Sequence, residues 1–136
     1  MRTSRVVLVA LVGAAVAGCG GDISAPRTVP TSGTVLFKGK PAGGVKVTLH
    51  PNFNMIFNPN GVTDKNGRFI LSTGTPMDGA PPGEYSVTFE LLRAGPDKRG
   101  LDSEFDVWKG KYANPDTAPK VTVGSSATTL EPFRLD

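Results

Sequence analysis

One feature of the sequence restricts the fold of this chain most. It is a series of short runs in which apolar and polar residues alternate, and most of these runs are bounded by glycine or proline. The longest run has an apolar residue at every second position: Tyr85, Val87, Phe89 and Leu91. Alternation with a period of two places the apolar side chains on one face of a β-strand. The 17 glycines and 12 prolines favour turns between such strands. The sequence therefore predicts short strands and turns rather than long helices.

Seven segments of this kind follow one another along the chain. They cover residues 34–38, 45–50, 61–63, 68–73, 85–91, 120–123 and 130–135. Short strands at this spacing favour a β-sandwich over a barrel or an α/β fold. We therefore expect one all-β domain, a β-sandwich of seven strands.

The tetrapeptide Asp64-Lys65-Asn66-Gly67 stands between two of these segments. Its oxygen-bearing side chains at positions 64 and 66 would suit half of a calcium loop, but residues 68–70 supply none of the further oxygen ligands that calcium needs. The same residues are typical of a hairpin turn in which Gly67 adopts a positive φ. The turn is the interpretation we adopt, and no metal site is predicted.

A second turn signal, Pro81-Pro82-Gly83, precedes the longest alternating run. The prolines restrict φ and the glycine permits a tight turn into the strand. Tyr85 follows directly, and we expect its ring to pack inside the sandwich while its hydroxyl bonds a polar partner.

The order of these blocks carries a resemblance to a known family. The segments "GTVLFKGKPAGGVKVTLHP", "TDKNGRFIL" and "PPGEYSVTF" resemble successive blocks of the carboxypeptidase-regulatory-like domain. The segment "KYANPDTAPKVTV" is similar to the closing part of small bacterial lipoproteins that carry this domain alone. The resemblance covers most of the chain from Ser32 to Asp136. It implies a transthyretin-like (prealbumin-like) β-sandwich that acts as a non-catalytic module.

The first residues have the composition of a secretory signal peptide. Arg2 and Arg5 precede an apolar run of about twelve residues, from Val6 to Ala17, which is within the usual length of the apolar region of a signal. Crossing a bilayer would take about twenty apolar residues. We therefore expect export of the chain and no integral membrane span.

Cys19, the only cysteine, ends this region in the sequence Val16-Ala17-Gly18-Cys19. The four residues resemble the lipobox of bacterial lipoproteins, which implies that Cys19 becomes the mature N-terminus and carries several acyl chains. Two or more chains suffice for stable anchoring. The alternative is an ordinary cleaved signal, which would leave an odd thiol in an oxidising compartment.

These expectations divide the chain into three parts. They are a signal peptide (1–18), a lipidated cysteine with a flexible tether (19–31) and the sandwich domain (32–136). The expected location is the cell envelope, on a membrane that faces the periplasm or the cell exterior.

The net charge argues against a nucleic-acid partner. The chain has 15 basic and 12 acidic residues, and loss of Arg2 and Arg5 with the signal leaves 13 basic and 12 acidic residues, a charge of +1. A charge this small supplies no stripe of cations to neutralise phosphates. The expected partners are the membrane, through Cys19, and an envelope protein or polysaccharide.

His50 is the only histidine, so a catalytic triad or a histidine-based metal site would have few partners. We expect it on the polar side of its strand. The transthyretin-like hydrolases act on a purine-derived ring and use several histidines and a characteristic C-terminal tetrapeptide, whereas this chain ends Phe133-Arg134-Leu135-Asp136. We therefore expect no enzyme activity, no catalytic residues and no cofactor; a small hydrolase is the weakest alternative.

The segment from Leu92 to Pro119 is long for a connection inside a sandwich. Its apolar residues Leu101, Phe105, Trp108 and Tyr112 are separated by four, three and four positions, which is helical spacing. Ser103-Glu104-Phe105-Asp106 also fits a capping box, and Gly110 could end a helix. The sequence therefore predicts one short helix near Ser103 to Lys109.

Two sets of aromatic residues are candidate contact surfaces. Trp108 and Tyr112, with Phe105, could form a stacking platform for a sugar or a partner protein, or could simply cover the core. Phe53 and Phe57 lie in a second apolar segment, "NFNMIFNPN", that could be an edge strand or a contact surface. The function expected is a non-catalytic binding or structural module, with glycan binding through the loop aromatics as the alternative.

Overall fold

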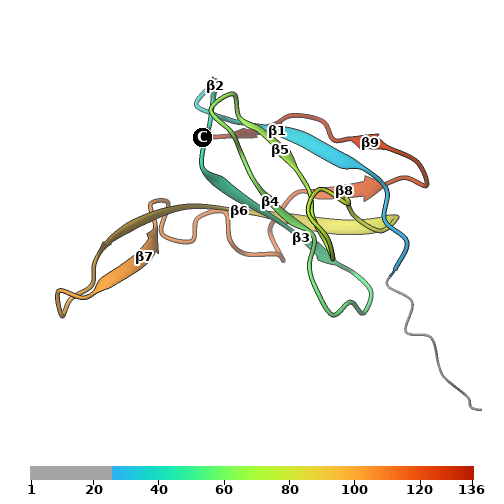
Figure 1. Ribbon diagram of the computed structural model, residues 1–136. Helices are drawn as coiled ribbons and strands as arrows, with labels where there is room; N and C mark the ends of the chain where they lie inside the picture. The colour runs from blue at the N-terminus through green and yellow to red at the C-terminus, as the bar shows by residue number, and fades with distance from the viewer. Residues whose placement is uncertain (1–25) are drawn as a thin grey trace, which may run out of the picture.

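The structure is a computed structural model that describes residues 26–136, and these residues form ten β-strands in two five-stranded sheets (Figure 1). The first sheet is built around β1 (Thr31–Phe37). β5 (Arg68–Ile70) and β2 (Lys40–Pro41) pair with β1 antiparallel, and β9 (Thr128–Thr129) and β10 (Phe133–Leu135) pair with it parallel. The last strand of the chain therefore returns to lie beside the first.

The second sheet is built on the pairing of β3 (Val45–Pro51) with β6 (Gly83–Pro96). β4 (Asn60–Val62) pairs with β3. β8 (Lys120–Val123) pairs with the first residues of β6, and β7 (Asp102–Asp106) pairs with its last residues. β6 is 14 residues long, about 45 Å at the usual rise per residue, so this one strand runs almost the length of the molecule.

The core lies between the two sheets. Alternate residues of β3 (Val45, Val47 and Leu49) are fully buried, as the period of two in the sequence requires. The rings of Phe89 in β6 and Phe133 in β10 meet edge to face, with their centroids 5.0 Å apart. Residues from both sheets thus form one apolar cluster, and the all-β, two-layered architecture expected from the sequence is confirmed.

Each of the seven segments expected as strands overlaps one, but the expected number of strands is wrong for residues 26–136. β2, β7 and β9 were not predicted. β2 and β9 have two residues each, too few for an alternating pattern to be visible. The sandwich also begins earlier than residue 32, because Val29 is buried and pairs with Ala80.

The predicted helix near Ser103 to Lys109 is wrong: across residues 26–136 no helix is present. β7 occupies Asp102–Asp106, and a turn follows from Asp106 to Gly110. β6 continues past Leu91, and a tight turn at Asp97 reverses the chain so that Arg93 pairs with Phe105. Cross-strand hydrogen bonds pair these two segments, and the helical spacing of the apolar residues does not correspond to one buried face.

Two local predictions, the turn at Gly67 and the packing of Tyr85, are confirmed. Gly67 has a φ of 73°, and its nitrogen donates to the carbonyl of Asp64 at 2.9 Å in a tight turn before β5. Tyr85 is buried, and its hydroxyl donates to the carbonyl of Pro81 at 2.6 Å.

Candidate functional site

The most distinctive feature of the molecule is a two-stranded ribbon that extends beyond the two-layered part (Figure 1). It comprises residues 92–106, the end of β6 and the whole of β7, and is called the arm below. β3 pairs with β6 only as far as Leu91. Within the part of the chain that the structure describes, no further strand pairs with either strand of the arm, so both of its edges are free.

The tip of the arm is a tight turn held by Asp97. Its Oδ1 accepts hydrogen bonds from the main-chain nitrogens of Arg99 (2.7 Å) and Leu101 (3.0 Å). These bonds stabilise the carboxylate and hold the pKa of Asp97 below its ordinary value. Gly100 has a φ of 77° and donates to the Asp97 carbonyl at 2.9 Å.

The base of the arm is held by Asp106, the last residue of β7. Its Oδ1 accepts from the main-chain nitrogens of Leu91 and Trp108, each at 3.0 Å, and its Oδ2 accepts from that of Gly110 at 2.8 Å. One side chain therefore ties β6, β7 and the following turn together.

Trp108 and Tyr112 lie together just beyond the base of the arm. Their rings meet edge to face at 5.1 Å, and the Trp108 ring lies 5.2 Å from that of Phe37. All three side chains are half-buried and pack against the core, and the Tyr112 hydroxyl donates to the main-chain oxygen of Asp136. Trp108 and Tyr112 thus lie together and cover this end of the core, which corresponds to the second of the two interpretations given for them above.

Phe105 does not join that cluster. It lies on the arm with 51% of its surface exposed. Its ring crosses the opposite strand at Gly95, where a Cβ atom would come within 2.8 Å of Cε1 of Phe105. Leu101, at the end of the arm, and Val107, just beyond β7, are exposed as well. The arm therefore carries its own exposed apolar surface.

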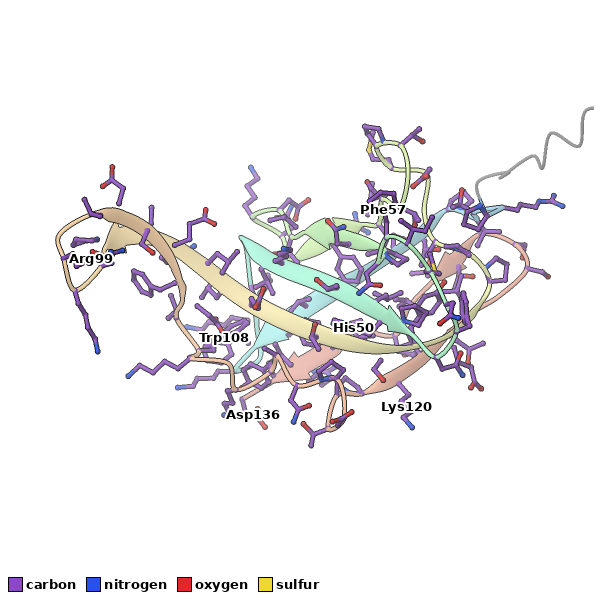
Figure 2. All side chains as sticks on the ribbon, turned by 90° about the horizontal axis from the view of Figure 1, so that it is seen from below. His50, Phe57, Arg99, Trp108, Lys120 and Asp136 are labelled. Atoms are coloured by element: carbon purple, nitrogen blue, oxygen red, sulfur yellow. The ribbon has the colours of Figure 1, made fainter. Side chains whose placement is uncertain are left out.

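Phe53 and Phe57 lie in the loop 52–59 between β3 and β4, away from the arm (Figure 2 labels Phe57 and Arg99). The Phe53 ring meets that of Tyr85 edge to face at 5.6 Å, whereas 66% of the Phe57 surface is exposed. The predicted aromatic residues are thus divided among three places rather than gathered in one site.

His50 lies at a polar groove of about 390 Å³ that is also lined by Glu84, Ser86, Asp116 and Lys120. Its Nε2 is 2.7 Å from Oγ1 of Thr88, and its Nδ1 is 3.4 Å from Nδ2 of Asn58. Burial lowers the pKa of His50, although the charge of Glu90 raises it. Both ring nitrogens are thus occupied by neutral side chains, and within the described chain no three His, Cys, Asp or Glu side chains gather as a metal site.

The arm is the feature that sequence reasoning missed, although a signal for it was present. Asp97-Lys98-Arg99-Gly100 repeats the pattern of Asp64-Lys65-Asn66-Gly67. In both turns the aspartate Oδ1 accepts from the nitrogens two and four residues later, and the glycine has a positive φ. The recognised turn at Asp64 could therefore have identified the second hairpin.

Comparison with known proteins does not identify a family for this chain. No family model matches the chain, and no curated protein matches it. Among solved structures, the chain is similar to a 9R-lipoxygenase from Cyanothece PCC8801, with 16% identity and a TM-score of 0.45 over 83% of this chain and 17% of that one. The chain thus spans less than a fifth of that protein, and no functional conclusion follows. In residues 26–136 no helix could serve as a transmembrane segment.

Proposed function

We propose that this chain is a lipid-anchored protein of the cell envelope whose transthyretin-like sandwich is a non-catalytic module for binding a partner protein. Cys19, which lies outside the described residues, would carry the lipid. The lipobox resemblance and the signal-like residues before it support this anchor.

The observation that carries the binding function is the arm. A two-stranded ribbon without further strands is only marginally stable in water, and an exposed strand edge is a template for pairing with another chain. The arm combines two free edges with exposed apolar side chains at Leu101 and Phe105. A partner that adds a strand to β7 would satisfy the free edge and cover these side chains.

The position of the arm also supports this proposal. In both views the arm and the first described residues lie at opposite ends of the molecule (Figures 1 and 2). A chain anchored at Cys19 would thus hold the arm away from its attachment point.

The alternatives fit the geometry less well. A glycan platform would present the flat faces of Trp108 and Tyr112 to solvent, whereas these rings pack against each other and the Trp108 ring also packs against Phe37. A hydrolase would pair His50 with a carboxylate and a nucleophile, whereas its ring nitrogens face Thr88 and Asn58.

A cross-linking experiment in intact envelopes tests the binding function. A photo-reactive residue would replace Phe105 on the arm or, as a matched control, Ile70, an exposed apolar residue of β5. We expect a discrete protein adduct from position 105 and none from position 70. Adducts of the same kind from both positions, or none from position 105, would contradict the proposal.

A shortened arm supplies the second control. Ala94 and Glu104 are paired, so residues 95–103 can be replaced by Asn-Gly, which favours a two-residue hairpin loop. This variant should fold and lose the adduct. The Cys19→Ala variant separates anchoring from binding, because recovery of the same adduct from it would show that the anchor is not needed for the interaction.

A further inference from the structure

The loop 52–59 presents two large apolar side chains to solvent. Ile56 is 82% exposed and Phe57 is 66% exposed, which are the two highest exposures among the large apolar residues described. They stand next to each other at the tip of the loop. Adjacent exposed apolar residues of this size are typical of a surface that contacts another molecule or a membrane.

Contacts between the loop 52–59 and the body of the domain hold the loop in place. The Phe53 ring packs against Tyr85, and Met55 packs against the core. At the base of the loop, the nitrogen of Leu49 donates to the carbonyl of Pro59 at 2.8 Å, and Pro59 is buried. Phe53 and Met55 therefore fix the loop, so that Ile56 and Phe57 are held outward rather than folded onto the domain.

The tip of the loop lies beside the first residues that the structure describes. Pro26 and Thr28 line one hollow of about 580 Å³ together with Ile56 and Phe57. Seven peptide units separate Cys19 from Pro26, so a fully extended chain reaches at most about 25 Å. An acylated Cys19 in a bilayer would therefore keep Pro26, which lines this hollow, within about 25 Å of the lipid headgroups.

The charged residues around the hollow, Asp78 and Arg27, are compatible with contact with an anionic membrane surface. Asp78 lines it, but its carboxylate accepts hydrogen bonds from the main-chain nitrogens of Thr73, Gly74 and Thr75 at 2.6, 2.9 and 3.0 Å. Burial raises the pKa of Asp78, but these bonds outweigh it and hold the pKa below its ordinary value. Arg27, between Pro26 and Thr28, is exposed and available to an anionic headgroup.

We propose that Ile56 and Phe57 insert into the surface of the membrane that holds the Cys19 lipid, so that the sandwich rests on the bilayer through the loop 52–59. This inference rests on the lipid anchor proposed above. Apolar side chains inserted in this way reach about 5–10 Å into the boundary between headgroups and acyl chains. Figure 2 shows the labelled Phe57 on the body of the molecule and Arg99 at the far end of the arm, so a bilayer in contact with the loop 52–59 would lie at a distance from the tip of the arm.

Fluorescence quenching on vesicles tests this proposal. The full chain, recovered in detergent from cells that make it, would be reconstituted with vesicles of phosphatidylethanolamine and phosphatidylglycerol that contain a nitroxide-labelled phospholipid. An environment-sensitive probe would be attached at Asn54→Cys, beside the loop tip, or at Arg99→Cys, at the tip of the arm. We expect the nitroxide to reduce emission about twofold or more at position 54 and to leave emission at position 99 unchanged.

Substitutions in the loop provide the decisive comparison. The double variant Ile56→Asn, Phe57→Asn should still float with the vesicles through Cys19, but its probe at position 54 should lose the quenching. Ile70→Asn removes an exposed apolar side chain elsewhere and should leave quenching unchanged.

The outcomes separate the two proposals. A chain that does not float with vesicles contradicts the lipid anchor. A chain that floats but whose probe at position 54 is quenched no more than that at position 99 overturns the docking of the loop. Transfer of excitation between probes at position 54 of two copies, without nitroxide quenching, would overturn it in favour of a dimer.

Discussion

The Asp106 carboxylate accepts a hydrogen bond from the main-chain nitrogen of Leu91, with Oδ1 and N 3.0 Å apart. It accepts from Trp108 and Gly110 as well, so it joins the last strand pair of the sandwich to the base of the arm. A carboxylate that satisfies three main-chain donors is a strong acceptor. Loss of this side chain should therefore loosen both the arm and the aromatic residues beyond it.

The first prediction concerns this residue. Asp106→Asn removes one acceptor oxygen and the negative charge, and should reduce the free energy of unfolding by about 1–2 kcal/mol. Trp108, the only tryptophan, should become more exposed and emit at longer wavelength. Urea denaturation followed by Trp108 fluorescence measures both changes. Asp102→Asn, at an exposed position of the same strand, should change the stability by less than about 0.5 kcal/mol.

The second prediction compares the two similar turns. Gly67 and Gly100 have φ values of 73° and 77°, so alanine is strained at both, by about 1–2 kcal/mol. A Cβ atom at position 67 would lie 2.5 Å from the carbonyl oxygen of Val35, whereas nothing lies within 4 Å at position 100. Gly67→Ala should therefore cost at least about 3 kcal/mol, and Gly100→Ala only the strain. Equal losses in urea denaturation would show that main-chain crowding at Gly67 is unimportant.

The third prediction concerns the pH dependence of the free energy of unfolding that is linked to His50. Burial lowers the pKa of His50 below its ordinary value of 6.5, so the folded chain binds a proton there less readily than the unfolded chain does. The stability linked to His50 is therefore fully present above about pH 6.5 and is lost as the pH falls below that value. Between about pH 7.5 and 5.5 the wild type should lose more unfolding free energy than His50→Gln. Parallel pH profiles for the two proteins would contradict this account.

The fourth prediction concerns Tyr85. Its hydroxyl donates to the carbonyl of Pro81, and both residues are buried. Tyr85→Phe leaves that carbonyl without its donor and should cost about 1–2 kcal/mol. Burial also raises the pKa of Tyr85 to about 12, so stability linked to this residue should decline above about pH 10, where the unfolded tyrosine ionises. Denaturation of wild type and Tyr85→Phe at neutral and alkaline pH measures both effects.

The local sequence pattern was sufficient to predict many of the strands and one of the turns. The alternation in β3 and the first part of β6 reports burial directly, because one face of each strand packs on the core. The turn at Asp64 and the packing of Tyr85 follow from equally local rules. The parallel pairing of β10 with β1 depends on contacts between distant residues, which no local pattern encodes.

The arm was missed for a different reason. The steps of four, three and four from Leu101 to Tyr112 matched a helix, but Leu101 and Phe105 are exposed on the arm, whereas Trp108 and Tyr112 are half-buried at its base. The hydrophobic spacing therefore did not describe one face. The turn signal at Asp97 was the better guide, because its hydrogen bonds are made within five residues.

Both the presentation of the arm and the docking of the loop depend on the proposed anchor at Cys19. The most direct measurement is the mass of the N-terminal peptide of the chain recovered from the membrane fraction of cells that make it. We predict that this peptide begins at Cys19 and carries the mass of a diacylglyceryl group, with or without a further acyl chain. A peptide with an unmodified Cys19 thiol, or with residues 1–18 still attached, would contradict the account.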